Sequence, residues 1–97
     1  MTPEEESRRG DEAARLLQHP LLIEAFELIE QEYTEQWKNS PARDEDGRQS
    51  IWLALKNLHK VKGHLEYTME TGKVAKASLL QQAAEAARNL GRKFSSD

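Results

Sequence analysis

The chain contains no cysteine, and this absence excludes disulfides, thiolate metal sites and thiol nucleophiles together. It also lacks a run of about 18 apolar residues, so no membrane span is predicted. No basic stretch followed by a short apolar segment is present, and no secretory signal is predicted either. Glycine-rich phosphate loops are absent as well. These absences leave a soluble protein that is compatible with a reducing cytoplasm.

The charges that are present divide the chain into two unlike parts. Residues 1–47 carry thirteen acidic and five basic side chains, whereas residues 48–97 carry four acidic and nine basic ones. The net charge of −3 argues against wholesale wrapping of nucleic acid. Opposite charges on two parts of one small chain predict surfaces that can pair between copies. Since 97 residues rarely bury a large core, self-association would add to stability.

Residues 1–18 predict a short helix that docks weakly. Thr2 can cap it, Pro3 fits the first helical turn, and Glu5 stands at the capping-box position. Gly10 is expected to interrupt this helix, since glycine weakens a helix interior. His19 precedes Pro20 and should be extended, which separates this segment from the next one.

Residues 20–39 predict the strongest helix. Its apolar stripe recurs at helical spacing and consists of Leu22, Phe26, Ile29, Tyr33 and Trp37. Leu21, Ala25 and Leu28 widen the stripe on one flank, which indicates a second packing partner. Residues 39–47 are rich in turn formers and acidic side chains, so they should form an exposed link in which Asp44 or Asp46 caps the next helix.

A third helix is predicted from about residue 47 to 71, antiparallel to the second, with Gly72 as its stop. A separate, alanine-rich C-terminal helix should follow over residues 74–90, and residues 91–97 should fray. The expected fold is therefore a single all-α domain spanning residues 1–97. Its centre is an antiparallel helical hairpin over residues 20–71, and it assembles into an oligomeric helical bundle.

No catalytic, cofactor or metal site is predicted. His59 and His64 are five residues apart and lie on different faces of a helix, and His19 precedes a proline. The carboxylates lie mostly opposite the apolar stripe, which indicates a solvated face rather than a catalytic cleft. No nucleophile, base and orienting group can be placed together, so an enzyme is the least expected class.

Three surfaces remain as candidate binding sites. Interface residues are expected at Leu21 and Leu28, on the widened flank of the second helix, and at Trp52. Trp37 and Trp52 flank the link, where they form either core packing or an aromatic patch for a partner. The acidic second helix offers Glu24, Glu27 and Glu35. The basic residues are either a solvating stripe or candidate phosphate contacts, and they are Arg48, Lys56, Lys60, Lys73 and Lys76.

Residues 41–80 carry a resemblance to a group of proteins. An acidic link is followed by Trp52 at the entry of a long helix, by His64-Leu65 within it, and by Thr71-Gly72-Lys73 ahead of an alanine-rich segment. In this order of features the chain resembles small helical proteins of tailed phages and prophages. The resemblance implies a phage-encoded protein of head assembly or DNA packaging, found in the host cytoplasm or in the virion. It carries over no catalytic residues.

These observations lead to three functional hypotheses. The first is a non-enzymatic structural or assembly protein that forms a homo-oligomer through charge-complementary surfaces, with a phage or host protein as a further partner. The second is an accessory protein that binds nucleic acid through the five basic residues. The third is a small inhibitor of a host enzyme or defence complex, in which the acidic second helix mimics a phosphate backbone.

Overall fold

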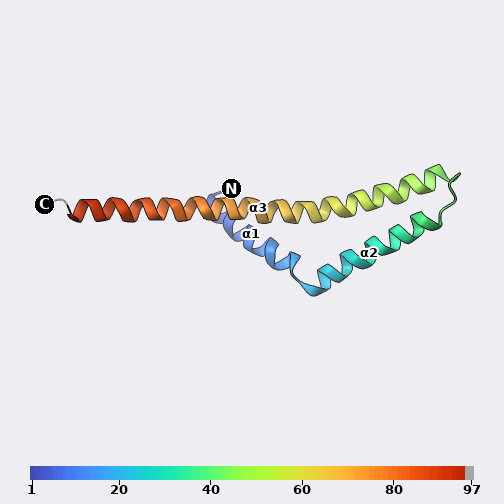
Figure 1. The fold of residues 1–97 in the computed structure, drawn as a ribbon, viewed down its shortest axis with the longest axis horizontal. Helices are drawn as coiled ribbons and strands as arrows, with labels where there is room; N and C mark the ends of the chain where they lie inside the picture. Colours follow the sequence, from blue (N-terminus) through green and yellow to red (C-terminus); the bar gives the residue numbers. More distant parts are fainter. Residues whose placement is uncertain (96–97) are drawn as a thin grey trace.

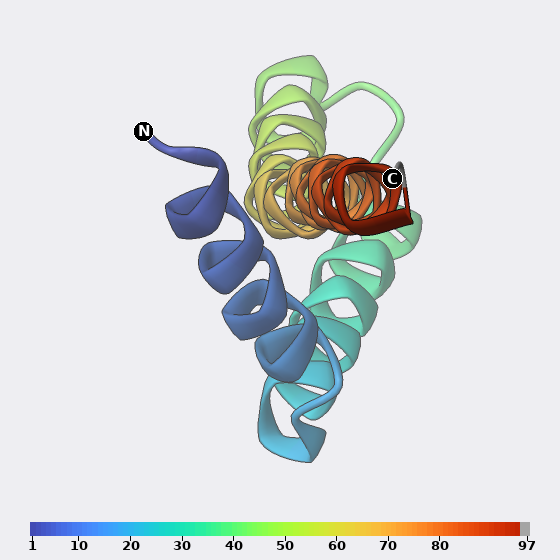
Figure 2. The same ribbon diagram turned by 90° about the vertical axis from the view of Figure 1, so that its left-hand side faces the viewer.

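The computed structural model describes residues 1–95 and forms three helices in this part of the chain. They are α1 (Pro3–Leu17), α2 (Pro20–Asn39) and α3 (Glu45–Ser95), and Figure 1 shows α3 running the full length of the molecule. Within residues 1–95 no strand is present, so the all-α class is confirmed. The molecule measures 83 × 25 × 18 Å. Seen end-on in Figure 2, α1 and α2 lie on the same side of α3.

Each helix begins at a residue whose side chain satisfies a backbone N–H. Thr2 Oγ1 accepts a hydrogen bond from the Glu5 N–H at 3.2 Å, with Pro3 in the first turn. Extended His19 caps α2 by accepting from the Leu21 N–H through Nδ1 at 3.2 Å. Asp44 Oδ1 accepts from the Gly47 N–H at 3.1 Å and starts α3. The caps predicted at Thr2 and Asp44 are confirmed.

Removing the first of these caps tests how much the start of α1 contributes. Thr2→Ala deletes the acceptor and leaves one more N–H of the first turn without a protein partner. We expect the free energy of unfolding to fall by about 0.5–2 kcal/mol. Urea unfolding followed by circular dichroism measures the loss. Thr2→Ser keeps the acceptor and should retain most of the stability, whereas equal losses in the two variants would contradict capping.

α3 is one continuous helix, and this corrects the predicted stop at Gly72. Its residues run from Glu45 to Ser95, so the expected separate helix over residues 74–90 does not exist. No residue of the described chain has a positive φ, and Gly72 therefore does not form a left-handed helix end. Gly91 also lies inside α3, so the helix does not end there; residues 96–97 lie outside the described part, and fraying of the tail stays a prediction.

The glycine at position 72 serves as a contact point between α1 and α3. A Cβ atom built on Gly72 would lie 2.5 Å from Gly10 Cα, and one built on Gly10 would lie 2.6 Å from Gly72 Cα. Ala13 and Ala75, one turn further along each helix, are buried. Small residues three apart on both helices let the two backbones approach closely. The prediction that Gly10 interrupts α1 is therefore wrong, whereas the strength with which α1 docks stays a prediction.

Large apolar side chains remain only half-buried within a single chain. Among the described residues, Ala13 and Ala75 are the only buried apolar side chains, and no large side chain is fully buried. The accessible surface is 7816 Å². A compact protein of the same 11.1 kDa mass would expose about 5,700 Å². The three helices thus form an open frame in which much apolar surface still faces solvent.

Candidate interaction surface

The outer flank of α2, defined here as Leu21, Ala25 and Leu28, is an exposed apolar strip. Phe26 and Tyr33 turn towards α3 and are half-buried. Leu21 and Leu28 are displaced from these residues by the helical spacing of about 100° per residue and remain 68% and 56% exposed. Two of the three predicted interface residues therefore lie on one strip that the chain itself leaves uncovered.

A second uncovered strip lies on the C-terminal arm, the part of α3 formed by residues 77–95. Lys76 of α3 pairs with Asp11 of α1, Leu79 is half-buried, and Figure 1 shows the arm continuing beyond both other helices. Every described side chain from residue 80 to 92 is exposed. Leu80 is 66% and Leu90 is 56% exposed, with Ala83 and Ala87 between them on the same side. This side continues the face of α3 that contacts α1.

The two tryptophans lie at the end of the molecule formed by the α2–α3 link, and both are exposed rather than packed in a core. The guanidinium of Arg48 lies 3.8 Å from the centre of the Trp37 ring. Its Nη1 donates to the carbonyl oxygens of Trp37 at 3.3 Å and Ser40 at 3.2 Å. It also donates to Ser40 Oγ at 3.1 Å. Trp52, the third predicted interface residue, carries Lys56 Nζ at 4.8 Å from its ring centre.

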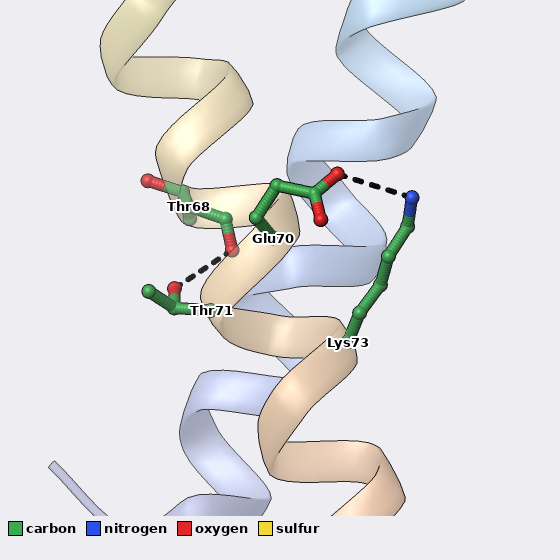
Figure 3. Close-up of polar contacts among 4 residues, drawn as sticks. All are labelled: Thr68, Glu70, Thr71 and Lys73. Atoms are coloured by element: carbon green, nitrogen blue, oxygen red, sulfur yellow. Dashed lines mark hydrogen bonds and ion pairs between the residues drawn. The ribbon is translucent and has the colours of Figure 1, made fainter.

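The structure does not gather the predicted phosphate contacts into one open face. Lys73 pairs with Glu70 at 3.2 Å, in the same turn where the Thr71 hydroxyl donates to the Thr68 carbonyl (Figure 3). Lys76 Nζ lies 3.6 Å from Asp11 Oδ1 on α1. Arg48 binds the C-terminus of α2 as described above and is half-buried. Lys56 and Lys60 remain one turn apart on an exposed face.

The acidic residues of α2 are exposed and only partly paired. Glu35 lies 3.9 Å from Lys38, one turn along the same helix. Glu30 Oε1 lies 3.5 Å from His59 Nε2 and links α2 to α3. Both pairs are well exposed and therefore add little to stability. Glu24 and Glu27, the other two predicted acidic contacts, also face solvent.

Sequence reasoning missed the contact that positions α1. The signal was a pair of matching patterns, Gly10 with Ala13 and Gly72 with Ala75, each placing two small residues on one helix face. The Lys76–Asp11 pair, which joins the same two helices, was also missed because Asp11 and Lys76 are far apart in the chain.

A metal-binding cluster and a membrane-spanning helix are both absent from the described residues. No cluster of three or more histidine, cysteine, aspartate or glutamate side chains suited to a metal ion occurs in the described part of the chain. Nor does any helix among residues 1–95 have the length and apolar character needed to cross a membrane. Comparison with protein-family models, with curated proteins and with solved structures found no match. The exposed apolar strips are therefore the features from which a function can be argued.

Proposed function

We propose that this protein is a non-enzymatic assembly protein that works by forming a homo-oligomer through its exposed helix faces. The observation that supports this proposal is the uncovered apolar surface of a chain with almost no core of its own. The accessible surface of 7816 Å² exceeds that of a compact protein of this mass by roughly 2,000 Å². A standard interface buries about 800 Å² on each partner, so the excess is large enough for a stable contact.

Association would be favourable because it buries the exposed leucines of the two strips. Burying one such side chain contributes about 1.5–3 kcal/mol. Four of them, Leu21, Leu28, Leu80 and Leu90, are more than half exposed in the single chain. Association that covers these side chains would provide the apolar burial that this chain lacks when alone. From the resemblance to small helical phage proteins we also propose that the assembly belongs to a phage head or its DNA-packaging apparatus, in the host cytoplasm or the virion.

Nucleic-acid binding is the second candidate, and the adjacent exposed pair Lys56 and Lys60 favours it. The other three basic residues already bind groups of their own chain. A face with two exposed cations, of which Lys56 also lies over the Trp52 ring, predicts weak affinity with a shallow salt dependence, because the salt effect scales with the number of phosphates contacted. The oligomer hypothesis requires no such cations and is therefore preferred. Inhibition of a host enzyme by the acidic side of α2 stays a prediction.

Light scattering of the purified protein, at low and high salt and with or without duplex DNA, tests the proposal. We expect a discrete oligomer that persists in high salt and ignores DNA. The double substitution Leu21→Glu with Leu28→Glu should reduce the mass towards the monomer value of 11.1 kDa, because each glutamate would be buried unpaired.

A matched control places the same charges elsewhere. Leu53 and Val74 are exposed on α3, and helical spacing turns Val74 away from the face that contacts α1. Leu53→Glu with Val74→Glu should retain the oligomer. A wild-type monomer at all salt concentrations would reject the proposal, and a mass gain that occurs only with DNA at low salt would favour the nucleic-acid hypothesis instead.

A further inference from the structure

We propose that the C-terminal arm of one copy packs against the outer flank of α2 in a second copy, and that the contact is reciprocal. This inference rests on the proposed function and names the surfaces that would carry it. Both surfaces are apolar strips whose leucines are more than half exposed in the described part of the chain. One has Leu21 and Leu28 at its ends, and the other has Leu80 and Leu90.

Charge decides which strip pairs with which. α2 carries five acidic residues, Glu24, Glu27, Glu30, Glu32 and Glu35, against the single base Lys38. The arm carries three basic residues, Arg88, Arg92 and Lys93, against the single acid Glu85. Pairing two arms, or two α2 helices, would bring like charges together, which is unfavourable. An arm against α2 instead brings opposite charges together around an apolar centre.

Length and position agree with this pairing. α2 has 20 residues and the arm spans residues 77–95 of α3, so each is about 30 Å long. α2 lies beside the N-terminal part of α3, whereas the arm is the opposite end of the same helix (Figure 1). When two copies place their α3 helices antiparallel, each arm therefore reaches the α2 helix of the other copy. Such a contact closes on itself around a two-fold axis.

The small side chains of the arm fit it for this role. Residues 83, 84, 86 and 87 are all alanine, and each is exposed. Alanine at a helix contact allows the two helix axes to approach closely, as the glycine and alanine contact between α1 and α3 already does within the chain. The same face of α3 thus binds α1 in its own chain first and, further along, a second copy.

Charge reversal on each surface tests the pairing. The arm variant is Arg88→Glu with Arg92→Glu. The α2 variant is Glu24→Lys with Glu32→Lys, one turn before and after Leu28. Alone, each variant would place like charges at both contacts, and its light-scattering mass at low salt should fall towards that of the monomer. An equal mixture would place opposite charges at both contacts and should regain the wild-type mass.

The pattern of results separates this inference from the proposed function. If the arm variant alone keeps the wild-type mass, or the α2 variant alone does so, that surface is outside the contact and the inference is wrong. A mixture that stays monomeric also overturns it. The control Lys56→Glu with Lys60→Glu should keep the wild-type mass. A wild-type protein that is itself monomeric would instead reject self-association as a whole, and circular dichroism of each variant verifies that the helices remain folded.

Discussion

Gly72→Ala is expected to lower the free energy of unfolding although alanine is the better helix former. A Cβ at this position would lie 2.5 Å from Gly10 Cα, 2.9 Å from the Glu6 carbonyl oxygen and 3.1 Å from the Gly10 nitrogen. All three atoms belong to the α1 backbone, which has to move as a unit. Overpacking of this kind costs about 1–3 kcal/mol. This cost exceeds the gain of about 1 kcal/mol that alanine brings over glycine in helix propensity.

The matched control is Gly63→Ala in the same helix. Apart from the adjoining backbone of its own helix, nothing lies within 4 Å of a Cβ built on Gly63, so only the propensity gain remains. We expect the Gly63 variant to gain up to about 1 kcal/mol. Urea unfolding at one fixed protein concentration measures both variants, since association makes stability depend on concentration. Opposite signs at two glycines of α3 would locate the effect in the α1 contact.

A proteolysis experiment identifies which helix is released. Arg8, Arg9 and Arg15 in α1 are trypsin sites, and cleavage there requires local opening of the helix. Gly72→Ala should accelerate cleavage in α1, whereas Gly63→Ala should not. Adding Gly10→Ala to Gly72→Ala should cost less than the sum of the single changes, because the helices have already moved apart. Stabilisation by Gly72→Ala would contradict the close contact.

Arg48→Ala is the second substitution from which we expect a large loss of stability. The Arg48 side chain donates to the carbonyl oxygens of Trp37 and Ser40 at the end of α2, where the Trp37 carbonyl also accepts from the N–H and the hydroxyl of Ser40. It also places a positive charge at the negative end of that helix and over the Trp37 ring. Hydrogen bonds from a charged donor contribute about 1.5–3 kcal/mol, and we expect a loss in this range.

Arg43→Ala provides the control for Arg48→Ala. Arg43 is an exposed cation in the same link, so its removal makes the same change in net charge. It should leave unfolding within about 0.5 kcal/mol of wild type, as surface substitutions usually do. In a Trp52→Phe background, the fluorescence of Trp37 should shift to the red only when Arg48 is removed. Equal effects of the two substitutions would mean that charge, and not the Arg48 contacts, stabilises the link.

The difference between Arg48 and its sequence-based prediction shows where local patterns are insufficient. As a basic residue at the start of a basic segment, Arg48 is by sequence either part of a solvating stripe or a candidate phosphate contact. Its partners Trp37 and Ser40 lie eleven and eight residues earlier. They come within reach because the link turns α2 back along α3. The side chain is thereby committed to its own chain, as Lys76 is by Asp11.

The sequence by itself determined the helices and most of their starts. Apolar spacing predicted α2, Thr2 and Asp44 predicted two caps, and Pro20 with His19 separated α1 from α2. These signals are local, because they depend on residues within one or two turns of each other. The same spacing placed Leu21 and Leu28 on a flank apart from the main stripe, and both are exposed.

The tertiary structure alone decided what Gly10 and Gly72 do. Considered singly, each glycine resembles a helix breaker or a helix end, but the packing of α1 on α3 makes both of them contact residues inside helices. The absence of a stop at Gly72 joins the expected third and fourth helices into the single helix α3. It therefore also creates the uncovered C-terminal arm. Helix propensity disfavours glycine by only about 1 kcal/mol, so a close packing contact can override it.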